Sequence, residues 1–176
     1  DIYFRMSLTD ALTGMFNHKY FQDSLEREML YSQRKKESLT IMMADIDGFK
    51  SVNDNYGHQA GDMVLQKISS NIIKACRSHD TVSRYGGEEF GIILPETGIE
   101  KSTRVAERIL DAVGSNSYPP VERRITVSIG IASFPEHATD REDLIQKADL
   151  ALYSSKEKGK NRFTIYDGSL DPDVRH

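Results

Sequence analysis

Two glycines and two acidic residues meet in Arg84-Tyr85-Gly86-Gly87-Glu88-Glu89-Phe90, the most informative stretch of the chain. Strand-like residues flank it at 81–83 and 90–94. Because glycine adopts positive φ at no steric cost, Gly86-Gly87 predicts a hairpin turn. Acids at a strand start can hold a cation, and glycines let a phosphate approach the backbone. A solvated hairpin with charged flanks is the alternative, and these residues alone do not decide between the two.

A second acidic cluster follows the apolar run 39–46, which is typical of a buried strand. Asp45 and Asp47 are two residues apart, so a continuing strand would point both side chains to one face. Carboxylates gathered at a strand end are costly unless a cation neutralises them. A small number of oxygen ligands suits Mg²⁺, because its other coordination positions are taken by substrate phosphates and water. A solvated strand end is the alternative, but two such clusters with lysines nearby favour a metal and phosphate site.

Alternating helices and strands must position these clusters. Apolar spacing predicts helices over residues 19–34, 49–56, 59–77, 100–113 and 141–158. Strands are predicted over 39–46, 81–83, 90–94, 124–134 and 162–166. The inner helix faces are expected to include Ile73 and Tyr153. The fold class is therefore α/β, a single domain with a mostly antiparallel central sheet flanked by helices.

Composition narrows the class of protein. A length of 176 residues suits one domain with a substantial core. The net charge of -4 and pI near 5.8 argue against nucleic-acid binding as the main task. No apolar run is long enough to span a membrane, and no signal peptide is visible. The single cysteine, Cys76, lies on an apolar helix face, so a buried, inert thiol is expected.

Six motifs, in order, resemble those of the GGDEF domain family, the catalytic module of diguanylate cyclases. The resemblance runs from about Leu8 to Asp167. Its motifs are Asp10-Ala11-Leu12-Thr13-Gly14 with Asn17; Asp45-Ile46-Asp47-Gly48-Phe49-Lys50; Asn53-Asp54 with Gly57-His58 and Gly61-Asp62; Arg84 to Phe90; Thr126 to Ala132; and Ala148 to Tyr153 with Lys156, Gly159 and Asn161. Six motifs in register leave little room for chance. The resemblance implies a fold similar to the palm of nucleotide cyclases and polymerases.

The resemblance also implies how the chain is divided. Residues 1–7 would end a linker helix, 8–167 would form the catalytic domain, and 168–176 would be a flexible tail. The chain starts at Asp1 without an initiator Met, so we expect a fragment whose upstream sensory or regulatory domain is missing. That missing region could carry a membrane anchor, while this segment is expected in the cytoplasm, where its nucleotide substrate is found. Relatives work as two domains face to face, so a transient homodimer is expected, and the isolated piece should dimerise poorly.

A chemistry follows from the family. The chain would condense two GTP molecules into cyclic di-GMP, each 3′-hydroxyl attacking the other α-phosphate while pyrophosphate leaves. By resemblance the Mg²⁺ ligands are Asp45, Glu88 and the Ile46 carbonyl, with Mn²⁺ as an alternative metal. Glu89 is the candidate for deprotonating the hydroxyl, although a water on the metal could serve. Asp47 is left open between a role at the metal and a supporting or structural role.

The resemblance assigns the substrate contacts as well. The phosphates would be held by the backbone at Gly48 and Phe49 and by Lys50, Lys156 and Lys160. Any one of these lysines could instead be a solvated surface residue. Lys160 stands where the family often has arginine, and without the bidentate fork we expect somewhat weaker phosphate binding.

Base recognition would come from Asn53 and Asp62. A carboxylate that accepts from N1 or N2 of guanine discriminates against adenine, so GTP selectivity is expected. Asp62 could instead be a helix acid that favours the macrodipole. His58, between them, is also a binding candidate, with a structural hydrogen bond as the alternative. The remaining substrate-binding candidates are Leu65, Gly86 and Gly87.

A product-binding site is implied upstream of the hairpin. Arg77-Ser78-His79-Asp80 matches the RxxD motif at which relatives bind cyclic di-GMP as an inhibitor, six positions before Gly86. Arginine can read a phosphate or a guanine edge bidentately, and aspartate can accept from N1 and N2. Arg108 stands where relatives supply a further arginine. A helix-end charge pair is the alternative for Arg77 and Asp80.

Three functions remain open at this point. An active diguanylate cyclase is favoured by the intact segment Gly86-Gly87-Glu88-Glu89. A catalytically weak effector or scaffold that binds cyclic di-GMP is the main alternative, but degenerate members usually lose these glycines or acids. A phosphotransfer or polymerase-like enzyme is disfavoured, because no basic groove for a template is visible.

Overall fold

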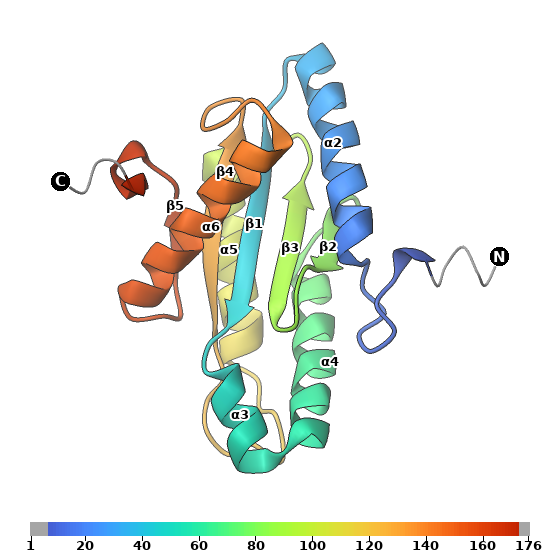
Figure 1. Ribbon diagram of the computed structural model, residues 1–176, viewed down its shortest axis with the longest axis vertical. Helices are drawn as coiled ribbons and strands as arrows, with labels where there is room; N and C mark the ends of the chain where they lie inside the picture. Colours follow the sequence, from blue (N-terminus) through green and yellow to red (C-terminus); the bar gives the residue numbers. More distant parts are fainter. Residues whose placement is uncertain (1–6, 173–176) are drawn as a thin grey trace.

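Within the described residues, five strands form one sheet in the order β2-β3-β1-β4-β5 (Figure 1). The computed structural model describes residues 7–172. The strands are β1 (Leu39–Ile46), β2 (Thr81–Arg84), β3 (Glu89–Leu94), β4 (Val127–Phe134) and β5 (Phe163–Ile165). β1 pairs antiparallel with β3 and β4, β2 pairs antiparallel with β3, and β5 runs parallel to β4. The predicted α/β class and mostly antiparallel sheet are confirmed.

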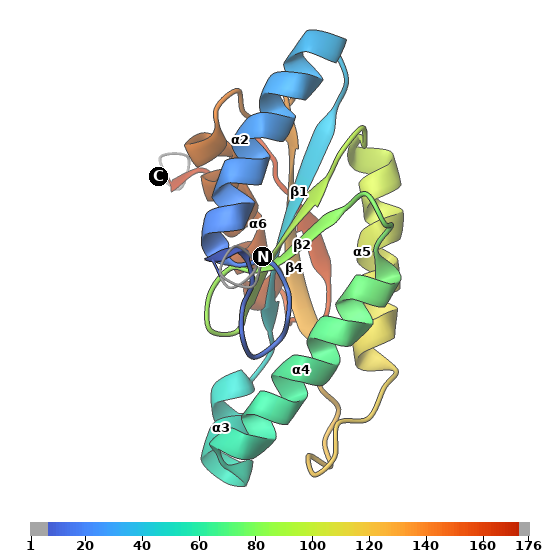
Figure 2. The same cartoon turned by 90° about the vertical axis from the view of Figure 1, so that its right-hand side faces the viewer.

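Helices cover both faces of this sheet. Figure 2 shows α2 (His18–Lys35) and α6 (Arg141–Glu157) on one side, and α4 (His58–Ala75) and α5 (Ile99–Gly114) on the other. The short helix α3 (Phe49–Tyr56) follows β1 directly and packs on α4. The chain therefore turns from β1 into α3 at one end of the sheet, where the acidic clusters were predicted.

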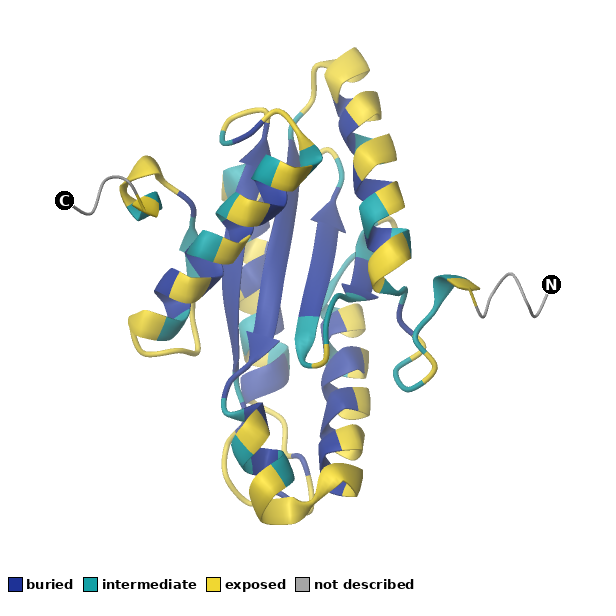
Figure 3. Ribbon diagram, viewed as in Figure 1, coloured by how far each residue is buried: buried dark blue, intermediate teal, exposed yellow. Residues whose placement is uncertain are grey.

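Side chains of β1 alternate between two hydrophobic cores, as expected for a strand covered on both faces. All residues of β1 and β4 are buried, and both strands are dark throughout in Figure 3. Toward α4 and α5 point Met42, Ala44 and Ile46; toward α2 and α6 point Leu39, Ile41 and Met43. Asp45 belongs to the second alternation, so its carboxylate faces the layer that contains α6.

Helix α6 lies directly on β4, because Gly130 has no side chain. A Cβ at Gly130 would stand 2.1 Å from the Ala148 carbonyl oxygen and 2.2 Å from the Leu152 backbone nitrogen. Such distances are far inside van der Waals contact, so no larger residue fits without moving the helix. The close approach fixes the height of α6 over the sheet and thereby places the polar residues at its far end.

Three details differ from the sequence-based expectation. Strand β4 begins at Val127 rather than at residue 124, because the partner strand ends where Gly48 (φ 68°) turns the chain into α3. Ile73 and Tyr153 were placed on inner faces, but they are 46% and 54% exposed. Each directly follows a buried residue, Ile72 or Leu152. Successive side chains of an α-helix differ by about 100° in direction, so the next one points away from the core.

The chain ends hold one further difference. Residues 168–176 were expected to be flexible, yet Gly168–Leu170 forms the 3₁₀ helix η1, with the Ser169 N–H donating to Asp167 Oδ1 at 2.8 Å. The Tyr166 hydroxyl also donates to Asp171 Oδ1 at 2.6 Å, so the first part of this tail is folded. Residues 1–6 and 173–176, which hold most of the expected linker helix and the chain end, lie outside the described residues. None of the helices in 7–172 is long and apolar enough to cross a membrane.

Candidate functional site

The hairpin turn and the end of β1 meet, as the sequence predicted. In the β1–β3 ladder Asp45 stands directly opposite Glu89. The Ile46 N–H donates to the Glu88 carbonyl at 3.2 Å, and the Tyr85 N–H closes the turn by donating to the Glu89 carbonyl at 2.8 Å. The two acidic clusters, more than forty residues apart in sequence, therefore form one group at the same end of the sheet.

Electrostatics within this group favour a cation. Burial raises the pKa of the Asp45, Glu88 and Glu89 carboxyls, and for both glutamates the next cause is the negative charge of Asp45. Lys156 opposes the shift, because its Nζ donates to Asp45 Oδ1 at 2.9 Å. Carboxylates that repel one another at a partly buried site gain from a positive neighbour.

The donor set fits a hard divalent cation. Two carboxylates and the Ile46 carbonyl offer oxygen ligands only, which is what Mg²⁺ prefers when it also binds phosphate oxygens and water. Within residues 7–172, no three His, Cys, Asp or Glu side chains form a complete metal-binding group by themselves. The fit therefore depends on the chemistry of the donors, with Asp45 and Glu88 as the two acidic ones.

Asp47 ties the site together structurally. Its carboxylate is buried and accepts from Thr126 Oγ1 and Ser128 Oγ, each at 2.7 Å, and from the Asn161 N–H at 3.1 Å. Both carboxylate oxygens thus have donors supplied by the protein. This arrangement favours the structural alternative for Asp47: it joins the start of β4 and the loop after α6 to the end of β1.

Lys156 contacts the carboxylates from α6, and Lys160 lies in the loop that follows this helix. The charge of Lys160 also opposes, by less than Lys156, the rise in the pKa of Asp45. Lys160 and Asn161 both have left-handed backbones, with φ of 66° and 49°, which is uncommon for a lysine. The bond from the Asn161 N–H to Asp47 holds this loop in place. Of the three predicted phosphate lysines, Lys156 therefore contacts Asp45, Lys160 acts on it electrostatically, and Lys50 is exposed on the first turn of α3.

The N-terminus of α3 is open toward a ligand. Gly48 is the N-cap in a left-handed conformation, and no side chain caps the helix. The first backbone N–H groups of a helix are natural donors to phosphate. Phe49 is 7% exposed and packs in the core, so only its backbone can take the predicted role.

Of the two base-recognition candidates, Asn53 of α3 lies against α4 at Gly61, the residue before Asp62. Asn53 Oδ1 stands 1.9 Å from the point where a Cβ on Gly61 would be, so this glycine makes room for the amide next to Asp62. Asp62 is exposed, as is His58 at the first position of α4. Leu65 is only 2% exposed and belongs to the core, so its side chain is not open to a ligand in this conformation.

Comparison with known sequences assigns this arrangement to a family. The sequence model described as "Diguanylate cyclase, GGDEF domain" matches residues 7–162. The chain belongs to the GGDEF family. Diguanylate cyclase A of Treponema denticola is 42% identical over 172 residues, which cover 94% of this chain and 46% of that protein. Diguanylate cyclase DosC of Escherichia coli K12 is 38% identical over 164 residues, covering 92% and 35%. This GGDEF domain thus spans less than half the length of these relatives.

Solved structures agree with the assignment. The GGDEF domain of DgcB from Caulobacter crescentus, in complex with c-di-GMP, matches with a TM-score of 0.82 and 34% identity, covering 90% of this chain and 93% of that one. The active GGEEF domain of a diguanylate cyclase from Vibrio cholerae matches with a TM-score of 0.82 and 30% identity, covering 87% and 98%. The diguanylate cyclase SiaD of Pseudomonas aeruginosa, in complex with its activator SiaC, matches with a TM-score of 0.86 and 32% identity, covering 93% and 64%.

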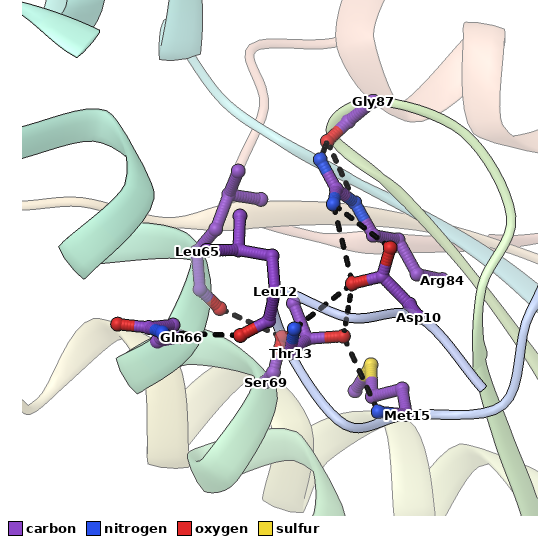
Figure 4. Close-up of polar contacts among 9 residues, drawn as sticks. All are labelled: Asp10, Leu12, Thr13, Met15, Leu65, Gln66, Ser69, Arg84 and Gly87. Atoms are coloured by element: carbon purple, nitrogen blue, oxygen red, sulfur yellow. Dashed lines mark hydrogen bonds and ion pairs between the residues drawn. The ribbon is translucent and has the colours of Figure 1, made fainter. Parts of the chain in front are cut away.

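A polar network connects the N-terminal loop of the GGDEF domain to its glycine turn (Figure 4). Arg84 donates from Nη1 to both oxygens of Asp10, at 3.1 and 3.2 Å, and from Nη2 to the Gly87 carbonyl at 2.8 Å. Thr13 donates to Asp10 from its N–H and its hydroxyl, at 2.9 and 2.7 Å. Gln66 of α4 donates to the Leu12 carbonyl at 3.0 Å. Asp10 and Arg84 belong to two of the sequence motifs, but the sequence did not predict that they form an ion pair.

Asp149, like Asp10, was part of a motif but had no predicted role. Partial burial of its carboxyl, followed by the charge of Glu89, raises the pKa of Asp149 to about 6, although the residue as a whole is exposed. Asp149 precedes Lys156 by two helical turns on α6. Helix α6 therefore brings both an acid, Asp149, and a base, Lys156, close to the carboxylates of Glu89 and Asp45.

The RxxD residues form a closed pair. Arg77 donates from Nε and Nη2 to the two oxygens of Asp80, at 3.2 and 3.0 Å, and from Nη2 to Thr97 Oγ1 at 2.7 Å. The Asp80 side chain is 0% exposed, so a ligand can contact it only after neighbouring groups move. Arg108 lies close by, donating to the Ala75 carbonyl at 3.1 Å. A surface hollow of about 410 Å³ borders Arg77 and Asp80.

Cys76, expected to be a buried and inert thiol, is half-buried next to Arg77. Burial, and then the charge of Asp80, raises its pKa to about 12. At neutral pH the thiolate, which is the reactive form, is therefore scarce.

Proposed function

We propose that this GGDEF domain is a diguanylate cyclase that condenses two GTP molecules into cyclic di-GMP and releases two pyrophosphates. The observation that carries the proposal is the intact group formed by Gly86-Gly87-Glu88-Glu89 and Asp45, with Lys156 bonded to it. Relatives named diguanylate cyclases support the proposal, as does a c-di-GMP complex of a similar domain.

In this proposal each part of the site has one task. The open N-terminus of α3 and the nearby lysines bind the triphosphate, and Asn53 with Asp62 binds guanine. Asp45, Glu88 and the Ile46 carbonyl hold Mg²⁺, or Mn²⁺ in its place, which would neutralise charge on the phosphates. Glu89 assists removal of the proton from the attacking 3′-hydroxyl. The phosphate lysines are Lys50, Lys156 and Lys160.

Two copies of the domain must cooperate. One site holds one triphosphate, and the reaction joins two nucleotides through two bonds, so we propose a transient homodimer with the sites face to face. These relatives are more than twice as long as this chain, and we propose that a sensory or regulatory domain, expected upstream, controls this encounter. Because GTP is a cytoplasmic substrate, we place the reaction in the cytoplasm. The product, cyclic di-GMP, would bind at Arg77, Asp80 and Arg108 and inhibit the enzyme.

A direct test is incubation of the purified chain with GTP and Mg²⁺, followed by chromatography of the nucleotides. We expect one cyclic di-GMP for every two pyrophosphates, and no product after a chelator is added. A chain that binds cyclic di-GMP but makes none, even at high protein concentration, would contradict this function. The closed Arg77–Asp80 pair beside its hollow would then favour the second candidate, a cyclic di-GMP-binding effector or scaffold.

Exchange of Asp62 for serine should weaken the preference for GTP over ATP. Asp62 is exposed beside Asn53, where its carboxylate can accept from guanine N1 or N2, and adenine lacks that pair of donors. Loss of one such contact costs about 1–3 kcal/mol. Product ratios from GTP and ATP measure the change, with Asp54→Ser as a control on neighbouring α3. An unchanged ratio would show that Asp62 serves only as a helix acid.

Exchange of Asp10 for asparagine should slow turnover while the domain stays folded. The neutral amide cannot hold the Arg84 guanidinium as an ion pair, so the bond from Arg84 to the Gly87 carbonyl loses its fixed partner. We expect a loss of roughly three- to tenfold in kcat, since a partly buried charged contact is worth about 1 kcal/mol. Pyrophosphate release and thermal unfolding measure the two effects. Turnover equal to that of the parent chain would mean that this network leaves the turn unaffected.

A further inference from the structure

Arg123 contacts the turn that begins α3. Its Nη2 donates to the Gly48 carbonyl at 2.8 Å. A Cβ on Gly48 would stand 3.1 Å from Arg123 Nη1 and 3.2 Å from Nη2, so the guanidinium fills the space where a side chain would be. Gly48 is therefore constrained twice, by its left-handed backbone and by this arginine.

The segment that carries Arg123 is anchored beside the site. Three residues later, the Thr126 carbonyl accepts from the Asp47 N–H at 2.9 Å, and the Thr126 hydroxyl donates to the Asp47 carboxylate at 2.7 Å. The connection from α5 to β4 thus runs along the two residues that link β1 to α3. The position of Arg123 is set by this backbone as well as by its own bond to Gly48.

We propose that Arg123 is a further positioning residue of the nucleotide site, acting on the triphosphate through Gly48. It holds the turn that aims the first backbone N–H groups of α3, and those groups have no side-chain cap. Its charge adds a further cation to those of Lys50, Lys156 and Lys160. A triphosphate carries several negative charges, so such a cation favours GTP over a nucleotide with one phosphate. This inference depends on the proposed function, because it assumes that α3 binds phosphate.

The next residue provides a matched control. Arg124 donates from Nε to the Gly114 carbonyl at 3.0 Å, at the end of α5. Replacing either arginine by alanine removes the same charge from neighbouring positions. Only Arg123→Ala removes the contact with Gly48.

The experiment compares Arg123→Ala, Arg123→Lys and Arg124→Ala with the parent chain. Pyrophosphate release gives KM and kcat for GTP, and calorimetry gives the affinities for GMP and for a GTP analogue with an α,β-methylene bridge. For Arg123→Ala we expect KM to rise on the order of tenfold, as for one charge-assisted hydrogen bond, with kcat changed much less. The analogue should bind more weakly and GMP nearly as before. The KM of Arg123→Lys should lie between those of the parent chain and Arg123→Ala, and the KM of Arg124→Ala should equal that of the parent chain.

Several results would overturn the inference. If Arg123→Ala and Arg124→Ala have equal effects, the role of Arg123 is only that of its net charge. If GMP and the analogue lose equal affinity, Arg123 does not act on the phosphates that GMP lacks. If Arg123→Ala does not fold, an unchanged KM in Arg123→Lys overturns it. Failure of the parent chain to turn over GTP would overturn the proposed function instead, while the two binding affinities would still test Arg123.

Discussion

Replacing Glu88 or Asp45 by alanine should abolish GTP turnover and leave the fold intact. Both carboxylates stand where β1 meets the hairpin, and both have a raised pKa because burial and like charge destabilise their ionised forms. In the proposed function they are the two acidic ligands of the divalent cation. Without either one, the charge of the triphosphate stays uncompensated at the reacting α-phosphate. We expect a loss of at least about a hundredfold in kcat, as for the removal of one strong transition-state contact.

The fold should survive both changes for a local reason. Removing the Asp45 carboxylate leaves Lys156 within 3.6 Å of Asp47 Oδ1, so the ammonium group keeps an acidic partner. Glu88 is half-buried in the turn, and its backbone bond from the Ile46 N–H does not involve the side chain. Pyrophosphate release measures turnover, and far-UV circular dichroism measures the fold. Glu107→Ala, an exposed change on α5, is the control. Normal turnover in either variant would remove these residues from the metal site.

Local signals made the main features of the site predictable. The glycine pair located the hairpin turn, although neither Gly86 nor Gly87 has the positive φ on which that prediction was based. The apolar run 39–46 predicted a buried strand with Asp45 near its end. Apolar spacing located each long helix, because a helix buries a stripe about 100° wide or more. The same rule misplaced Ile73 and Tyr153, since residues next to the stripe look alike in sequence whether they point inward or outward.

Roles that depend on distant partners were not predictable. The sequence left Asp47 open between a metal and a structural role, and only the fold supplies the donors from Thr126, Ser128 and Asn161 that favour the structural one. The Asp10–Arg84 pair joins residues 74 positions apart. No local pattern marks such partners; only the tertiary fold brings them together. The sequence showed which residue types were present, and the packing of α6 and the connection to β4 determined what each one touches.

The double change Arg77→Ala and Asp80→Ala should remove tight binding of cyclic di-GMP while catalysis persists. Asp80 is completely buried against Arg77, so Arg77→Ala alone would leave a buried carboxylate without its charge partner. Such an unpaired charge destabilises a fold by about 3–5 kcal/mol, and changing both residues avoids it. Calorimetry with cyclic di-GMP measures the loss of binding. Initial rates at several GTP concentrations should show noncompetitive inhibition by product in the parent chain and none in the variant.

The structure sharpens what this experiment decides. The Arg77 side chain makes three hydrogen bonds to Asp80 and Thr97, so a ligand that draws Arg77 away from them must supply the free energy to break those bonds. Arg108→Ala should therefore weaken product binding less than the double change, because Arg108 does not close the pair. Arg104→Ala, an exposed change one turn earlier on α5, is the control. If the double variant binds product as tightly as the parent chain, Arg77 and Asp80 only end a helix. If it loses catalysis as well as binding, the pair is a structural support of the domain.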